Sequence, residues 1–225
     1  MAISILLIFL RIPTHAKALT KQAAGYFTDL LSGLRYIRSH EFVRVFFLFA
    51  SIFFFLAAPV AFLSPLQVAR SFGDDVWRLA AVEVIFSAGM LVGGIIMAVW
   101  GGFKNKARSL AFAGLMMGGC TFAIGIAPLF WLYLIFVAVN GVSLPIFNTP
   151  AMVLLQQKVD EDFLGRVFGV MGMITSMMMP LGMLMFGPMA DFVKIEGMFI
   201  GTGILMFIGG VFMWKNKVLV RDGIT

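Results

Sequence analysis

Residues 147–169 read FNTPAMVLLQQKVDEDFLGRVFG, and they join two long apolar segments through a short charged hinge. The hinge holds five charged residues within nine positions: Lys158, Asp160, Glu161, Asp162 and Arg166. On each side the chain runs without a charged residue for more than the roughly 20 positions that an α-helix needs to cross the hydrocarbon core of a bilayer. The stretch therefore predicts two membrane-spanning helices joined by a turn in water.

The same pattern extends through the whole chain. Of its 225 residues, 61% are hydrophobic and 12% are charged, and the mean hydropathy is +1.00. Soluble domains carry roughly a quarter charged residues, so lipid is the expected solvent. Six apolar runs are long enough to span a bilayer, near 43–64, 79–100, 108–128, 130–154, 166–188 and 197–214. None shows the alternation of an outer-membrane barrel strand, so we expect an all-α polytopic membrane protein built as a six-transmembrane-helix bundle.

Cysteine and charge exclude other classes of protein. Cys120 is the one cysteine, so no intrachain disulfide can form, and no Cys/His spacing predicts a metal site. We expect no metal and no cofactor. The net charge of +6 would suit nucleic acid, but the basic residues are spread over short loops between apolar runs. That distribution indicates membrane topology and no nucleic-acid partner.

The basic residues predict the orientation in the membrane. If the first full span runs outward, all but three of the 17 lysines and arginines lie in the cytoplasmic segments 11–44, 101–109, 155–166 and 215–225. The three exceptions are Arg70, Arg78 and Lys194. Under the positive-inside rule, both ends of the six-helix set are cytoplasmic.

The first residues predict a segment that continues from further upstream. Residues 1–12 are apolar but too short to span a bilayer. A signal peptide is one interpretation, since Ala16-Lys17-Ala18 resembles a cleavage site, but signal peptides carry their positive charge before the apolar core. We expect 1–12 to end a preceding transmembrane helix, and the chain to be the back portion of a longer protein, with Met1 an internal start or a gene-prediction artefact. A cytoplasmic linker (13–42), the six-helix bundle (43–214) and a cytoplasmic tail (215–225) follow.

The linker contains its own apolar stripe. Its members recur at helical spacing: Phe27, Leu30, Leu31, Leu34 and Ile37. Such a stripe predicts an amphipathic helix that lies on the cytoplasmic membrane surface and tethers two membrane halves.

Glycines and prolines within the spans predict how the helices pack. GxxxG pairs, which let membrane helices approach closely, occur at Gly89–Gly93, Gly114–Gly118, Gly165–Gly169 and Gly197–Gly201. Prolines that remove a backbone donor and kink a helix are Pro59, Pro145, Pro150, Pro180 and Pro188. Interrupted helices often surround a substrate pathway, which favours the fourth span as a pathway-lining helix.

Three polar side chains at membrane depth are candidates for that pathway. Glu83, a turn into the second span, is either a proton-coupling or cation-recognising group, or an interfacial residue paired with Arg70 or Arg78. Asn140 and Asn148 either bind substrate or satisfy backbone groups freed by the nearby prolines.

The fifth span is rich in methionine, a flexible side chain that suits a pocket for varied apolar ligands. Its methionines are Met171, Met173, Met177, Met178, Met179, Met183 and Met185. They cover every face of the helix, so at most a minority line a pathway, and Met177 is taken as the candidate.

Four segments resemble one known family. QQKVDEDFLGRVFGVMG (156–172) and PLGMLMFGPMAD (180–191) are similar to the C-terminal half of major facilitator superfamily transporters. The resemblance is to the branch of macrolide-efflux-type and enterobactin-exporter-type carriers. In that branch, DLLSGLRYIRSHEFVR (29–44) resembles the central linker, and FLSPLQVARSFG (62–73) resembles the first outer loop of this half.

The resemblance implies a fold and a function. It implies twelve helices in two six-helix bundles, of which this chain supplies the second bundle, and a separate N-terminal half as partner. It also implies alternating access, usually driven by protons, with export of small amphipathic molecules such as drugs, macrolides or siderophores across a bacterial plasma membrane. GGFKNKAR (101–108) occupies a pseudo-equivalent gating position with Lys104, Lys106 and Arg108, but lacks the acidic residue that opens the usual pattern.

The charged hinge then predicts a gate. Asp160 or Asp162 would cap the helix that starts near Phe163. Gly165 and Arg166 lie just inside that helix, where a cation opposes the helix dipole. An arginine there suits a partner across the cytoplasmic face, such as a carboxylate or helix C-terminus of the other bundle, and such pairs can close an inward gate.

Two other functions compete with transport. A membrane-embedded enzyme would carry HExxH, GxSxG or paired intramembrane aspartates, and none occurs in the sequence. The histidines are His15 and His40, both in the linker. The remaining alternative is an inactive fragment, or a half-subunit that needs a separate N-terminal half.

Overall fold

The structure is a computed structural model that describes residues 26–223, and this part of the chain is helical almost throughout. Its helices are α3 (Tyr26–Ser39), α4 (Glu41–Ser71), α5 (Val76–Trp100), α6 (Lys106–Ile126), α7 (Phe130–Lys158), α8 (Leu164–Met189), α9 (Ile195–Lys215) and α10 (Lys217–Asp222). The expected preceding helix (1–12) and the first half of the expected linker lie outside the described residues.

The six long helices α4 to α9 confirm the expected bundle, because each is long and apolar enough to cross a membrane. Their ends differ from the apolar runs. The first span, expected near 43–64, continues to Ser71 through the polar residues Gln67 and Arg70. Hydropathy marks where a helix leaves the hydrocarbon, whereas backbone hydrogen bonds continue for as long as the chain stays helical.

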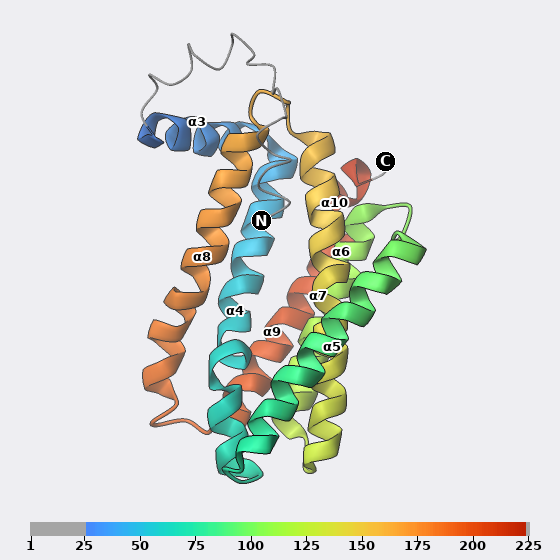
Figure 1. Cartoon of the computed structure of the whole chain (residues 1–225). Helices are drawn as coiled ribbons and strands as arrows, with labels where there is room; N and C mark the ends of the chain where they lie inside the picture. Colours follow the sequence, from blue (N-terminus) through green and yellow to red (C-terminus); the bar gives the residue numbers. More distant parts are fainter. Residues whose placement is uncertain (1–25, 224–225) are drawn as a thin grey trace, which may run out of the picture.

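The long helices alternate in direction (Figure 1), and each packs mainly on one or two neighbours. α4 lies between α8 and α9, α9 packs along α6, α6 along α7, and α7 along α5. α3 lies across one end of the bundle, over the start of α8, and α10 lies at the same end (Figure 1). This end also holds the 101–105 and 159–163 loops. We call it the basic end, because of all the described lysines and arginines only Arg70, Arg78 and Lys194 lie at the opposite end.

Two large packed clusters fill the bundle, one toward each end, and a smaller third cluster holds Phe53, Leu56 and Met206. The cluster at the basic end includes Phe46, Leu110, Leu154 and Met213, and the other includes Tyr133 and Phe199. In lipid, such contacts hold helices together through close packing, because lipid tails are as apolar as the side chains themselves.

Glycines decide the closest helix contacts. A Cβ atom on Gly89 would overlap the Ala138 carbonyl oxygen, and one on Gly93 would overlap that of Val142, so α5 and α7 touch backbone to backbone. Gly118 plays the same part between α6 and α9. By contrast, a Cβ on Gly165, Gly169 or Gly201 would meet nothing within 4 Å, so the last two GxxxG pairs are not contact sites within the described chain.

Candidate functional site

An ion pair joins α3 to the first turns of α8 at the basic end. The Arg166 Nε and Nη2 atoms each lie 2.8 Å from Asp29 Oδ1. The side chains are 25% and 41% exposed, so the pair is partly screened by water. The arginine that opposes the α8 dipole thus has its partner carboxylate on the helix that precedes the bundle.

A second contact attaches α3 to the hinge between α7 and α8. The Tyr36 hydroxyl donates to Asp160 Oδ2 and accepts from the Asp160 backbone N–H, both at 3.1 Å. The Tyr36 ring stacks between His40 and Phe163, with centroids 3.9 and 4.6 Å away. The Arg166 guanidinium lies 5.4 Å from the Phe163 ring centroid, which links the two contacts into one cluster.

The cluster is closely packed. Gly33 in α3 lies so near α8 that a Cβ would be 3.1 Å from the Arg166 carbonyl oxygen and 3.2 Å from Val170 Cγ2. Tyr36 is 6% exposed. Burial raises the pKa of Tyr36. The hydrogen bond from the Asp160 backbone N–H opposes this and the Asp160 carboxylate adds to it, but burial is the largest effect, so the phenol stays protonated and can donate. We call Asp29, Tyr36, Asp160, Phe163 and Arg166 the α3 latch.

The latch corrects one expectation for the hinge. Neither Asp160 nor Asp162 caps α8 through its side chain, because Phe163 is the N-cap residue and no side-chain cap bond forms there. Instead the backbone N–H groups of Phe163 and Leu164 donate to the Asp160 carbonyl oxygen, which leaves the Asp160 carboxylate free to accept from Tyr36. The Asp160 carboxylate therefore binds α3 and does not cap α8.

The other expected gating loop is held by the C-terminal helix. Asn105 Nδ2 donates to the Val220 carbonyl oxygen at 2.7 Å, and the Lys106 N–H donates to that of Gly223 at 2.8 Å. Lys104 is exposed, and the Arg108 guanidinium lies 6.0 Å from the Trp214 ring centroid. Within residues 26–223, no carboxylate pairs with either cation.

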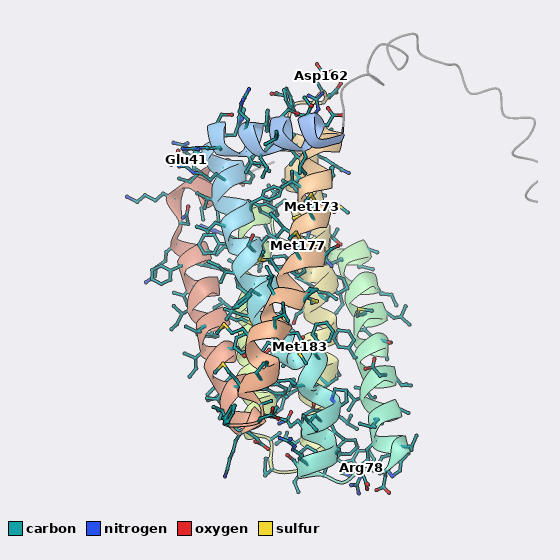
Figure 2. All side chains as sticks on the ribbon, turned by 90° about the vertical axis from the view of Figure 1, so that its left-hand side faces the viewer. Glu41, Arg78, Asp162, Met173, Met177 and Met183 are labelled. Carbon is teal, nitrogen blue, oxygen red and sulfur yellow. The ribbon has the colours of Figure 1, made fainter. Side chains whose placement is uncertain are left out.

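The four expected pathway residues do not form one group. Asn140 is buried, and its Nδ2 donates to Thr121 Oγ1 at 3.4 Å, so it joins α7 to α6. Asn148 on α7 and Met177 on α8 are exposed. Figure 2 shows Met173, Met177 and Met183 in succession along α8.

Glu83 is exposed on α5. The two arginines considered as its partners are engaged elsewhere: Arg78 lies 3.3 Å from Asp75 Oδ2, and Arg70 donates to the Ala190 carbonyl oxygen. By helical spacing, Glu83 shares a face with Ser87 and Gly94, beside the seam that packs on α7.

α5 and α8 present the most exposed surfaces of the bundle. Within the most apolar stretch of each helix, 22% of α5 and 17% of α8 residues are buried, against 56% in α6. One exposed face of α8 carries Gly165, Gly169 and Gly172, none of which a neighbour in the described chain approaches. In lipid, glycines at this spacing are typical of helix–helix contacts, and within residues 26–223 this face of α8 makes none.

Sequence patterns missed several residues that join the elements. Asp29 and Tyr36 lie in the expected amphipathic helix, but no pattern in the sequence marks them, and none marks Thr121 or Asn105. Only the contact with Asp29 has an indication in the sequence, because Arg166 near the start of α8 favours a carboxylate partner. Nothing local in the sequence shows which of the described acidic residues would meet it.

Comparisons with known proteins now supply the family. The sequence profile of the Major Facilitator Superfamily matches residues 1–183. Macrolide efflux protein A of Streptococcus pyogenes is 25% identical over 205 residues, which cover 90% of this chain and 51% of the relative. The protein of the same name from Enterococcus faecalis is 25% identical over 182 residues, which cover 80% and 56%.

A third relative is also an efflux protein by its name. Multidrug efflux pump Tap of Mycolicibacterium fortuitum is 28% identical over 138 residues, which cover 60% of this chain and 33% of the relative. No solved structure gives a significant match. The chain spans about half the length of the macrolide efflux proteins that it matches. It belongs to the major facilitator superfamily, in the branch of the macrolide efflux proteins.

Proposed function

We propose that this chain forms the C-terminal half of a secondary transporter that exports small amphipathic molecules, such as drugs, macrolides or siderophores, in exchange for protons. One observation carries the proposal: the likeness to macrolide efflux proteins covers 90% of this chain and about half of the relatives. The alternative is a fragment without activity of its own.

The partner in this proposal is an N-terminal six-helix half. Its helices would pack on the exposed faces of α5 and α8, where Glu83 is exposed and where a Cβ on Gly165, Gly169 or Gly172 would meet nothing within 4 Å in the described chain. Substrate would then pass between the halves, beside Asn148 and Met177. Asn140 has a different part, because its amide already joins α6 and α7.

The basic end is cytoplasmic in this proposal, since 11 of the 14 lysines and arginines among the described residues lie there. Residues 1–12 would end the preceding membrane helix, 13–42 would form the cytoplasmic linker, and 215–225 the cytoplasmic tail. The α3 latch would then act as a gate element on the cytoplasmic side. Rocking of the two halves would pull on the linker, and the latch would resist that pull in one of the two states.

A transport assay with a supplied N-terminal half tests the function. We expect this chain alone to give bacteria no macrolide resistance, because one bundle cannot enclose a pathway. Fusing the N-terminal six-helix half of the Streptococcus pyogenes relative ahead of it should raise resistance and lower the accumulated drug. The measurement is the inhibitory concentration together with uptake of labelled macrolide.

The matched control is the same N-terminal half expressed without this chain. Resistance from the lone 225-residue chain would contradict the need for a partner. A fusion that reaches the membrane, folds and moves no drug would favour the inactive fragment.

Glu83→Gln tests proton coupling in the fused transporter. The change removes one titratable carboxyl at nearly constant shape. We therefore expect the stimulation of efflux by the proton gradient to fall by about tenfold or more. Drug efflux from vesicles with and without an imposed pH difference measures this. Asp191→Gln, at an exposed carboxylate beyond the end of α8, is the control. An unchanged gradient dependence would make Glu83 an interfacial residue.

A further inference from the structure

An open groove runs along the outside of the bundle between α4 and α9. It has a volume of about 380 Å³, and its walls are apolar: Phe49, Ile52, Leu205, Ile208, Gly209 and Phe212. A second groove of about 360 Å³ continues from it, shares Ile52 and Leu205, and reaches Met178 on α8. Together they form one apolar channel on the surface, which we call the α4–α9 groove.

The groove ends in two polar side chains at the basic end, Lys215 and Asn216. Asn216 Oδ1 accepts from the N–H groups of Val218 and Leu219 at 3.0 and 3.1 Å, which fixes the side chain. Within residues 26–223, neither Asn216 Nδ2 nor the Lys215 ammonium has a hydrogen-bond or ion-pair partner. The mouth therefore presents a positive charge and free N–H donors, and no acidic residue lines it.

The length of the groove matches one leaflet of a bilayer. From Lys215 to Leu205 the helix rises about 15 Å at about 1.5 Å per residue. Half of a hydrocarbon core of roughly 30 Å has the same length. The charged mouth lies at the end of a spanning helix, at headgroup depth, and the floor lies near the midplane.

The geometry points to a phospholipid site. An anionic phospholipid binds with one acyl chain in the α4–α9 groove and its phosphate on Lys215 and Asn216. Three features together select this occupant: an apolar channel one leaflet deep, a cation at headgroup level that has no partner among the described residues, and fixed amide donors beside it. A neutral lipid would leave the net positive charge at the mouth uncompensated. The site does not depend on the transport proposal, because all of its lining residues belong to this chain and none is among the proposed pathway residues Glu83, Asn148 and Met177.

Native mass spectrometry of the purified full chain tests the site. The probes are phosphatidylglycerol and phosphatidylcholine with identical acyl chains, added in equal amounts to detergent. We expect the wild-type chain to retain phosphatidylglycerol in preference. Lys215→Gln should lower that preference about fivefold, the factor that corresponds to about 1 kcal/mol for one lysine at a lipid surface. Lys215→Arg should keep it.

Two further variants distinguish binding at this site from nonspecific electrostatic attraction of anionic lipid to the basic end. Lys217→Gln removes the same charge two residues away, outside the groove lining, and should leave the preference unchanged. Ile52→Trp fills the apolar channel without changing charge, and should release both lipids.

Each alternative result overturns the proposal. An equal loss in Lys217→Gln would show diffuse surface charge, and an unchanged preference in Lys215→Gln would show that the lysine does not select the lipid. Binding that survives Ile52→Trp would place the lipid elsewhere. If Lys215→Gln fails to fold, as judged by its melting temperature in detergent, the site is tested by the other two variants. Lys215→Arg must then keep the preference for phosphatidylglycerol and Ile52→Trp must abolish lipid binding.

Discussion

Gly93→Leu is expected to prevent α5 from packing on α7. A Cβ at this position would overlap the Val142 carbonyl oxygen and lie 2.9 Å from the Val142 Cα. Backbone atoms inside a helix cannot move aside as a side chain can, so the cost should equal or exceed the upper end of ordinary overpacking, about 3 kcal/mol or more. Unfolding by denaturing detergent, followed through tryptophan fluorescence, should show a much lower midpoint, and α5 should become accessible to protease.

The next residue provides the control. Gly94 is exposed, and a Cβ there would meet nothing within 4 Å. Gly94→Leu adds the same side chain to the same helix, so we expect the free energy of unfolding of this chain to change by less than about 0.5 kcal/mol and the midpoint to stay close to that of the wild type. Equal destabilisation by both changes would mean that loss of glycine in itself matters, and that the α5–α7 contact does not.

Arg166→Glu is expected to release α3 from the bundle. The change removes the two 2.8 Å contacts with Asp29 and places a third carboxylate beside Asp29 and Asp160. Because the pair is partly exposed, the ion pair itself should contribute about 1 kcal/mol or less, and like-charge repulsion adds to the loss. We expect amide hydrogen exchange in α3 to become faster by about tenfold, while exchange in α6 stays unchanged.

A charge exchange separates the pair from other effects. Asp29→Arg combined with Arg166→Glu restores opposite charges and should bring the exchange rate of α3 most of the way back to that of the wild type. Arg35→Glu, at an exposed arginine of the same helix, makes the same charge reversal away from the latch and should leave the rate unchanged. Fast exchange in the doubly changed chain would show that the Asp29–Arg166 pair does not hold α3.

Local patterns predicted the elements well and their contacts poorly. The apolar stripe of the linker predicted the helix that became α3, but it did not separate the residues that face the bundle from those that do not. Ile37 is buried against α4 and α8, whereas Leu31 is 63% exposed. The stripe is wide enough for two surfaces, and only the position of α8 decides which part is covered.

The GxxxG pairs show the same limit. Four pairs have equal spacing in the sequence, yet Gly89 and Gly93 touch a neighbouring backbone while Gly165 and Gly169 have open space around them. Spacing makes a close approach possible, but the neighbouring helix must also be there. The same limit holds for Asn140. Its position at membrane depth made it a pathway candidate, but its contact with Thr121 depends on how α6 and α7 pack.

The sequence by itself determined the six spans and the uneven distribution of charge between the two ends. Both follow from the free energy of transfer into lipid, which each segment meets separately and which composition therefore records. Only the tertiary structure decided that Arg166 pairs with Asp29, that Tyr36 binds Asp160, and that Lys215 lies at the end of an apolar groove. The first two contacts join residues 137 and 124 positions apart. They depend on how whole helices pack, and no local pattern encodes that arrangement.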